Sequence, residues 1–397
     1  MQNHFIIEML GIKDNNVKVW DISQGSDALI VELYTEKRQQ KCPFCRCKTK
    51  RVHSYRIQPI QGPVLPNQQV KLFLRKRRYL CKDCGKTFYE RLQMVDRYQR
   101  CTTSVQAEAL MYTSSSSFKT AARWTGLTDT RLLRLFDRRN IKTNRVLPRA
   151  IAIDEFKGDA GGERFQTVIV DVENKHIIDI LEDRKVDTIK KYLRSRDTGQ
   201  VEIVVMDMSK WFKKAVCDVL DHPLIIADRF HFMRQVYWAL DEVRRQVQAD
   251  VDKPIRLQMK RGKKLLWKSH FNLDEDQEEK VEKLLEIDTR LREAYQLKVM
   301  MEKWFKESDH QTASKNLDHC LASIKRSRIE AFHRVRKTFL NWRQEILQAF
   351  VYPYNNGYIE GVNNTIKVIK RNSYGIKGFE RLKKKILWQQ EMKKVMG

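Results

Sequence analysis

The sequence predicts a multidomain chain in which an α/β core follows a small cysteine-containing region and leads into an all-helical block. The length of 397 residues exceeds that of one simple domain. Between residues 150 and 228, apolar runs typical of strands alternate with amphipathic segments, which is the pattern of an α/β fold. Residues 229–350 contain almost no strand pattern and carry Lys and Glu at helical spacing.

The N-terminal region is expected to form short strands and a metal site. Its first 40 residues alternate apolar and polar stretches. Two cysteine pairs at the CxxC spacing follow, Cys42 with Cys45 and Cys81 with Cys84. Four thiolates satisfy tetrahedral Zn²⁺ and leave no open position, so we expect one structural zinc ion. The 35 residues between the pairs exceed the usual finger spacing and fit a ribbon with long hairpins.

Two alternatives to this ligand set remain open. Cys47 and His53 lie close enough in the sequence to replace one of the four cysteines. The four cysteines could also be unmetallated core residues, although paired CxxC motifs are specific for metal. Disulfides are not expected, because the chain shows no export signal and no apolar run long enough to span a membrane, and should stay in a reducing cytoplasm.

Basic residues are concentrated in two separate regions of the chain, whose net charge is +27. Residues 1–150 hold 29 Lys and Arg against 12 Asp and Glu, a net of +17, and residues 361–397 hold 10 against 2, a net of +8. Two separated basic regions suggest an extended contact with a polyanion, and nucleic acid is favoured over an acidic membrane. A generally basic solvated surface is the alternative.

The first basic region contains two candidate DNA-binding motifs. A run of four basic residues just before the second cysteine pair suits phosphate contacts, or is a solvated face; it comprises Arg75, Lys76, Arg77 and Arg78. Residues 118–134 have the plan of a helix-turn-helix, in which Ala122 allows close helix packing, Gly126 makes the turn and Leu127 fills the core. The Ser114–Ser117 run should cap its first helix at Phe118. The second helix would present three side chains to DNA: Thr130, Arg131 and Arg134.

Three acidic residues stand out by position. Asp154 is expected to end the first strand of the α/β core and Asp207 the fourth, and Glu360 lies on a helix after the helical block. Acids at the carboxyl ends of neighbouring strands point into one crevice. Three hard oxygen donors suit two Mg²⁺ or Mn²⁺ ions that promote phosphoryl transfer. Each aspartate could instead be a turn former or a cap, so the prediction depends on the combination.

The helix expected at 358–371 has two distinct faces. Helical spacing puts Glu360 on a polar face suited to a phosphodiester backbone. The DNA-binding residues predicted on this helix are Asn363, Asn364, Lys367, Lys370 and Arg371. The opposite stripe is apolar and should be buried; it comprises Ile359, Val362, Ile366 and Ile369. The asparagines could also be ordinary surface residues.

These residues lie in segments that resemble the DDE transposases of bacterial insertion sequences, in the ISL3 family. The matching segments are CPFC with RRYLCKDCGKTF, AIDEFKG, VVMDMSKWFKKAV, IIADRFHF and YIEGVNNTIKVIKRNSYG, in the family's order. The resemblance implies a ribonuclease H-like core and carries the metal-binding triad onto Asp154, Asp207 and Glu360. Asp228 and His231, in the DRFH stretch, are interpreted as residues near the site and not as ligands.

The resemblance also implies a domain order and partners. We expect strands and a zinc ribbon at 1–100, a helix-turn-helix at 101–147, the first part of the core at 148–231, a helical insertion at 232–350, and the last part of the core with a basic tail at 351–397. The implied partners are double-stranded DNA, as terminal inverted repeats and as target, and further copies of the chain in a dimer or larger assembly on DNA. The implied location is the bacterial cytoplasm, at the nucleoid.

Two other functions would explain part of the sequence. A zinc-containing DNA-binding regulator without catalysis accounts for the charge, the cysteines and the helix-turn-helix. An RNA-processing nuclease with the same ribonuclease H-like core accounts for the α/β region and its acidic residues. A metal-dependent strand-transfer assay separates all three functions.

Overall fold

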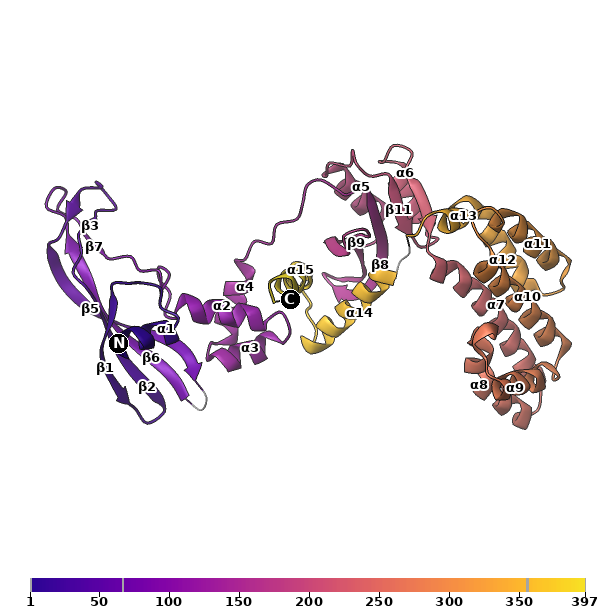
Figure 1. The fold of residues 1–397 in the computed structure, drawn as a ribbon, viewed down its shortest axis with the longest axis horizontal. Helices are drawn as coiled ribbons and strands as arrows, with labels where there is room; N and C mark the ends of the chain where they lie inside the picture. The colour runs from indigo at the N-terminus through magenta and orange to yellow at the C-terminus, as the bar shows by residue number, and fades with distance from the viewer. Residues whose placement is uncertain (1, 66–67, 355–356, 397) are drawn as a thin grey trace. The chain divides into compact units, whose positions relative to one another are not determined.

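The computed structural model describes residues 2–65, 68–354 and 357–396 (Figure 1). The chain divides into two compact units. The first comprises residues 1–141, 368–376 and 384–397, and the second comprises residues 142–367 and 377–383. Within the described part of the chain, no helix combines the length and apolar character needed to cross a membrane.

The first unit contains a mixed sheet with a helix at its start. Helix α1 (Gln2–Met9) precedes strands β1 (Val17–Gln24) and β2 (Ala28–Thr35), and the long strands β5 (Val52–Leu65) and β6 (Gln68–Leu80) follow. The order is β1-β2-β6-β5, with β7 (Thr87–Tyr89) also paired to β6. Alternate apolar residues on β1, β2 and β6 pack into one core on a single face of the sheet, as period-two patterning requires. The sequence predicted short strands in the first 40 residues, where β1 and β2 lie, but missed α1.

A three-helix bundle completes the first unit. It consists of α2 (Thr103–Tyr112), α3 (Phe118–Thr125) and α4 (Asp129–Asp137). The Ser117 side chain caps α3 as predicted, by accepting a hydrogen bond from the backbone N–H of Thr120. Gly126 ends α3 with a φ of 68°, a left-handed conformation that glycine adopts without strain.

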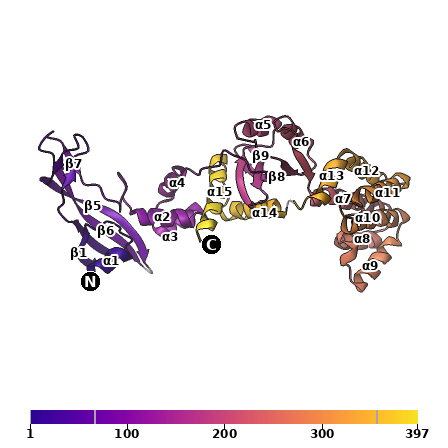
Figure 2. The same cartoon turned by 45° about the horizontal axis from the view of Figure 1, so that its top comes forward.

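The second unit contains a five-stranded sheet with helices. Strands β8 (Ala150–Ala160), β9 (Glu163–Asp171) and β10 (His176–Leu181) form an antiparallel meander. Strands β11 (Ile203–Met206) and β12 (Leu224–Ala227) add in parallel beside β8, which gives the order β10-β9-β8-β11-β12. Helices α5 (Val186–Arg194) and α6 (Lys210–Cys217) pack on one face of this sheet (Figures 1 and 2).

Helices occupy the chain between β12 and the last two helices. They are α7 (Arg229–Asp250), α8 (Lys253–Trp267), α9 (Glu275–Leu285), α10 (Thr289–Glu307), α11 (Ala313–Arg326), α12 (Glu330–Asn341) and α13 (Arg343–Val351), with a short 3₁₀ turn at His270–Asn272. The expectation of an all-helical block is confirmed for the described residues. Helix α13 packs against β12, so the block returns to the sheet before α14 (Gly357–Asn372) begins.

Aromatic side chains hold part of this block together. Trp304 is buried between rings from three helices, and its Nε1 donates a hydrogen bond to the Ala313 carbonyl. Trp342 is also buried. Both therefore act in helix packing.

The sequence assigns all of residues 351–397 to the core. The last helix, α15 (Phe379–Met396), only partly agrees with that assignment. Its residues from Lys384 onward belong to the first unit, where the Trp388 indole donates a hydrogen bond to the Leu110 carbonyl and joins the helix-turn-helix core. Lys385, fully buried, donates to the Ser116 carbonyl. An uninterrupted helix carries no break in its sequence pattern that would reveal this change of packing partner.

Candidate active site and metal centre

Three aspartates lie in a row at one edge of the α/β sheet. The parallel pairing of β8, β11 and β12 ends in register, at Ile153, Met206 and Ala227. The next residue on each strand is an aspartate: Asp154, Asp207 and Asp228. Carboxyl ends of neighbouring parallel strands share one edge, so the topology alone brings these side chains together.

The expectation that Asp154 ends its strand is wrong. Strand β8 continues to Ala160, paired with β9 on its other side. Asp154 instead stands where β8 loses its parallel neighbour, because β11 ends one position earlier, at Met206. The carboxylate therefore projects from a strand that is held on one side and open on the other.

Asp154 is buried and is hydrogen-bonded from two directions. Its Oδ1 accepts from the backbone N–H of Glu155, and its Oδ2 accepts from the Asn363 side chain of α14, each at 2.8 Å. Burial raises the pKa of Asp154 to about 7, with the charge of Asp207 adding to the increase and the Glu155 N–H opposing it. Sequence reasoning placed Asn363 on DNA, whereas the structure shows it contacting a carboxylate.

Asp207 and Asp228 flank a histidine. The Nδ1 atom of His231 lies 4.0 Å from Asp207 Oδ2, and its Nε2 atom lies 3.8 Å from Asp228 Oδ2. Burial and the charge of Arg234 lower the pKa of His231 to about 4, so the ring is neutral at pH 7. Burial, followed by the charge of Glu155, raises the pKa of Asp207 to about 6.

Glu360 lies on α14, one helical turn before Asn363. Its side chain is exposed. The apolar stripe of this helix is buried as predicted, which directs the face carrying Glu360 and Asn363 away from the core. Among the described residues, one group alone brings three or more metal-ligating atoms within 4.8 Å of one another, and it is made of cysteines. The three carboxylates are therefore more widely spaced than this limit.

The aspartate row fits a divalent cation. Asp207 Oδ1 is buried and has no hydrogen-bond partner in the described structure, although a buried polar atom normally has one. The buried Asp154 and the half-buried Asp207, both with raised pKa values, repel each other, and a hard cation would remove that repulsion. The donors are carboxylate oxygens, which Mg²⁺ and Mn²⁺ prefer.

The four predicted cysteines come together in the first unit. The Sγ atoms of Cys42 and Cys84 are 3.7 Å apart, and those of Cys45 and Cys81 are 3.4 Å apart. Tetrahedral zinc with its usual Zn–S bonds requires about 3.8 Å between sulfurs. Cys47 lies outside this group.

The two knuckles have the same backbone plan. In each, the fifth residue has a positive φ, 65° at Arg46 and 68° at Gly85, and donates its N–H to the first cysteine's carbonyl. The 35-residue gap is filled mainly by the long hairpin of β5 and β6, as the ribbon prediction required. His53, the other alternative ligand, is exposed and contacts Ser54.

The predicted DNA-contact residues are distributed unevenly over the surface. Thr130 and Arg134 are exposed on α4, and Arg131 is half-buried beside Gln99. Arg75 is exposed on β6, whereas Arg77 donates to the backbone carbonyl and hydroxyl of Thr35 and so serves the sheet itself. Lys76 and Arg78 are half-buried; on α14, Lys370 is half-buried while Asn364, Lys367 and Arg371 are exposed.

The fold and these two centres define the class as a zinc-ribbon and helix-turn-helix protein with an acidic catalytic domain. Residues 151–386 match a DDE transposase model of ISL3 elements. Residues 38–84 match the zinc finger of the IS204, IS1001, IS1096 and IS1165 transposases, and residues 90–140 match the helix-turn-helix domain of transposase family ISL3. The chain belongs to the ISL3 family of transposases, which makes it an enzyme and a DNA-binding protein and not a regulator alone.

Individual relatives agree with this membership. The transposase of insertion sequence IS1001 from Bordetella parapertussis is 26% identical over 367 residues, which cover 89% of each chain. The transposase of IS1557 from Mycobacterium tuberculosis is 24% identical over 260 residues, 59% of this chain and 58% of the relative. A Lactococcus lactis protein described as an ATP-dependent protease is 32% identical over 107 residues, 27% of this chain and 33% of the relative.

Proposed function

We propose that this transposase cuts and joins DNA at a site formed by Asp154, Asp207 and Glu360. The observation that carries the proposal is the register of β8 and β11, which brings the buried Asp154 and the half-buried Asp207 to the same edge of the sheet, with α14 hydrogen-bonded to Asp154. The strand order, with an antiparallel meander followed by two parallel strands, supports a ribonuclease H-like core with a helical insertion between β12 and α14.

In this proposal the three carboxylates hold two Mg²⁺ or Mn²⁺ ions. Such ions, when bound, activate the attacking oxygen and stabilise the leaving one in phosphoryl transfer. The chain's own residues orient the ligands. Asn363 fixes the rotamer of Asp154, and the neutral His231 separates Asp207 from Asp228 without adding positive charge.

The first unit would recognise the DNA ends. One zinc ion held by the four cysteines would fix the ribbon, and α4 of the helix-turn-helix would present Thr130 and Arg134 to the terminal inverted repeats. The polar face of α14 would contact the phosphodiester backbone near the cut. Because each insertion sequence has two ends, we propose that two or more copies of the protein act together on DNA.

Glu360 offers the sharpest test of the triad, since its exposure makes it the least constrained of the three. Duplex DNA carrying the element's own ends is incubated with Mg²⁺, and strand cleavage and joining are followed on denaturing gels. Glu360→Gln should abolish both reactions while binding of the ends in a gel shift is retained. The exposed helical Glu380→Gln is the matched control and should act as the unchanged protein does. Normal cleavage by Glu360→Gln would remove this residue from the site.

A further inference from the structure

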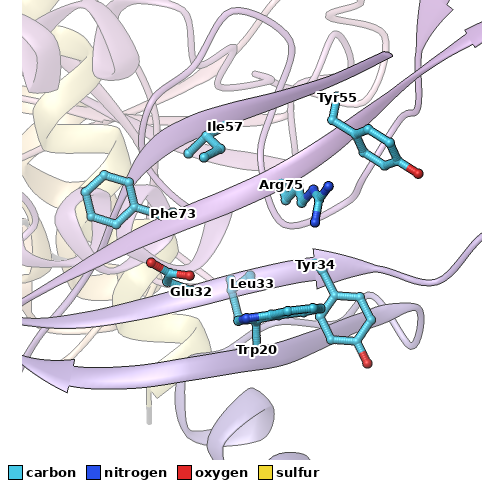
Figure 3. A pocket seen from close by; sticks show the side chains of 8 residues that line it. All are labelled: Trp20, Glu32, Leu33, Tyr34, Tyr55, Ile57, Phe73 and Arg75. Carbon is cyan, nitrogen blue, oxygen red and sulfur yellow. The ribbon is translucent and has the colours of Figure 1, made fainter. Parts of the chain in front are cut away.

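The sheet of the first unit has an open face that carries aromatic side chains. Its opposite face packs on the core. On the open face, Trp20 is 65% exposed and Tyr55 is 51% exposed, while Tyr34 and Phe73 are half-buried. These side chains line a depression of about 480 Å³. Figure 3 shows them in close-up. Exposed apolar side chains gathered in one place are typical of a binding surface.

An arginine stands between the aromatic groups. Arg75 on β6 is in register with Tyr34 on β2 and with Ile57 on β5, so it lies at the middle of the face. Its guanidinium lies 4.5 Å from the centre of the Tyr55 ring. On the other side, the rings of Trp20 and Tyr34 meet edge to face, with centroids 5.6 Å apart.

The charged residues of this face are mostly basic. Lys71 alternates with Phe73 and Arg75 along β6, and Lys18 pairs with Tyr34 across β1 and β2, so both lysines share the open face. Glu32 is the single acid that lines the depression. Asp21 pairs with Glu32 across β1 and β2, so it shares the open face. Three cations against two carboxylates leave the face with a net positive charge among its aromatic rings, a combination that suits nucleic acid.

We propose that this aromatic face binds single-stranded DNA. Unpaired bases would stack on Trp20 and Tyr55, with phosphates next to Arg75 and the two lysines. Duplex DNA cannot use the face in this way, because its bases are already stacked on one another and present only their edges. The inference concerns a surface separate from the carboxylates and does not depend on their assignment.

A second copy of the chain is the other conceivable occupant. In a two-fold interface the same patch meets itself, so residue i contacts j and j contacts i. That arrangement would bring the cations of one face against those of the other, and like charges across an interface disfavour association. Charge complementarity therefore selects the polyanion.

The test uses the full chain and a fluorescent oligothymidine of about 16 nucleotides, the upper site size for such surfaces. Binding is measured at a salt concentration that suppresses contacts made by phosphates alone, with unlabelled duplex as competitor. We expect Trp20→Ala and Tyr55→Ala each to weaken binding by roughly 5- to 150-fold, as loss of one stacked base does. Trp20→Phe should keep most of the affinity.

Tyr98→Ala is the matched control. Tyr98 is 85% exposed and has Arg97 over its ring, yet it lies outside the aromatic face. It should leave oligothymidine binding unchanged. Circular dichroism confirms that each variant is folded, which is expected because the substituted side chains are exposed. Unchanged binding by the Trp20→Ala/Tyr55→Ala double variant would overturn the proposal, and so would an equal loss in Tyr98→Ala.

Sedimentation velocity of the same proteins tests the other occupant. If the double variant converts a dimer into a monomer while oligothymidine binding stays intact, the face is a protein interface and the proposal is wrong. Asp154→Asn should bind oligothymidine normally, since its site lies in the second unit. A failure of the catalytic proposal would thus be distinguishable from a failure of this one.

Discussion

The cysteine centre and the carboxylate centre solve opposite problems. The four sulfurs already lie within 4.8 Å of one another, in a closed group with two of its four members buried. The carboxylates come from two strands and a helix, do not converge to that limit, and include an exposed member. A structural site gains from being complete before the ion arrives, whereas a catalytic site has to leave positions for water and substrate.

The two centres also differ in how they affect folding. The two knuckles that carry the cysteines have little core of their own, so their metal would supply folding energy directly. The aspartates lie in a well-packed α/β core, where their mutual repulsion opposes folding. Losing a ligand should therefore destabilise the first centre and stabilise the second.

The largest effect is expected at the cysteines. Cys81→Ser, which changes a fully buried ligand, should remove the one zinc ion that we expect per chain and unfold the two knuckles around Cys42 and Cys81, because zinc binding to such sites is worth on the order of 10 kcal/mol. The strands β5 and β6 should stay folded, because they pack on the core of the sheet. Elemental analysis and limited proteolysis measure both losses. Cys47→Ser is the control and should retain metal. A zinc-free protein with an intact ribbon would contradict the comparison.

Asp154→Asn and Asp207→Asn should abolish DNA cleavage and joining by a factor on the order of 10³ or more, because an amide supplies no negative charge to a cation. Binding of the DNA ends should persist, since we assign it to the first unit. The reactions are followed with Mg²⁺ on DNA that carries the element's ends. Asp221→Asn, whose side chain is fully exposed, serves as the control. Retained cleavage in either variant would remove that aspartate from the site.

The sequence predicted the first centre more completely than the second, for physical reasons. Each CxxC knuckle is a local turn, so its spacing brings its own two sulfurs together and identifies the two pairs as one candidate site, with Cys47 and His53 left as alternatives for one ligand. The sequence placed Asp154 on the correct strand but wrongly at the end of that strand. The parallel pairing beside Asp154 ends where β11 ends, and β11 lies 49 residues further along the chain. The Asn363 contact depends on helix placement that periodicity does not specify.

In the absence of Mg²⁺ and Mn²⁺, the raised pKa values of the carboxylate centre should make the free energy of unfolding depend on pH. The pKa values of Asp154 and Asp207 are raised from 3.8 to about 7 and about 6. Between pH 4 and 7 these two carboxyl groups bind more protons in the folded chain than in the unfolded chain, so they make stability fall as pH rises through that window. His231, whose pKa is lowered from 6.5 to about 4, opposes them, but one group does not offset two.

At pH 8, with no Mg²⁺ or Mn²⁺ added, Asp154→Asn should accordingly be more stable than the unchanged protein, by on the order of 2 kcal/mol. Urea unfolding of the second unit measures the difference, without chelator so that the cysteine centre keeps its metal. Added Mg²⁺ should stabilise the unchanged protein and not the variant. A less stable Asp154→Asn would show that the carboxylate is held by favourable contacts that outweigh its burial.

The smallest effect separates two adjacent asparagines on α14. Asn363 donates to Asp154 and its own Oδ1 is buried, whereas Asn364 is exposed and contacts Lys367. Residues that orient a metal ligand typically contribute about 10- to 100-fold to activity or metal affinity. Asn363→Ala should therefore lower the cleavage rate by about tenfold and raise the Mg²⁺ concentration needed for half-maximal rate. Asn364→Ala should leave that concentration unchanged and, if the residue touches the phosphodiester backbone, should weaken DNA binding instead.

Titrating Mg²⁺ at saturating DNA distinguishes the two variants, because a residue that contacts only DNA cannot shift the metal dependence under that condition. Equal metal dependence in both variants would mean that the hydrogen bond to Asp154 plays no part in holding the cation, and that α14 acts on the DNA alone.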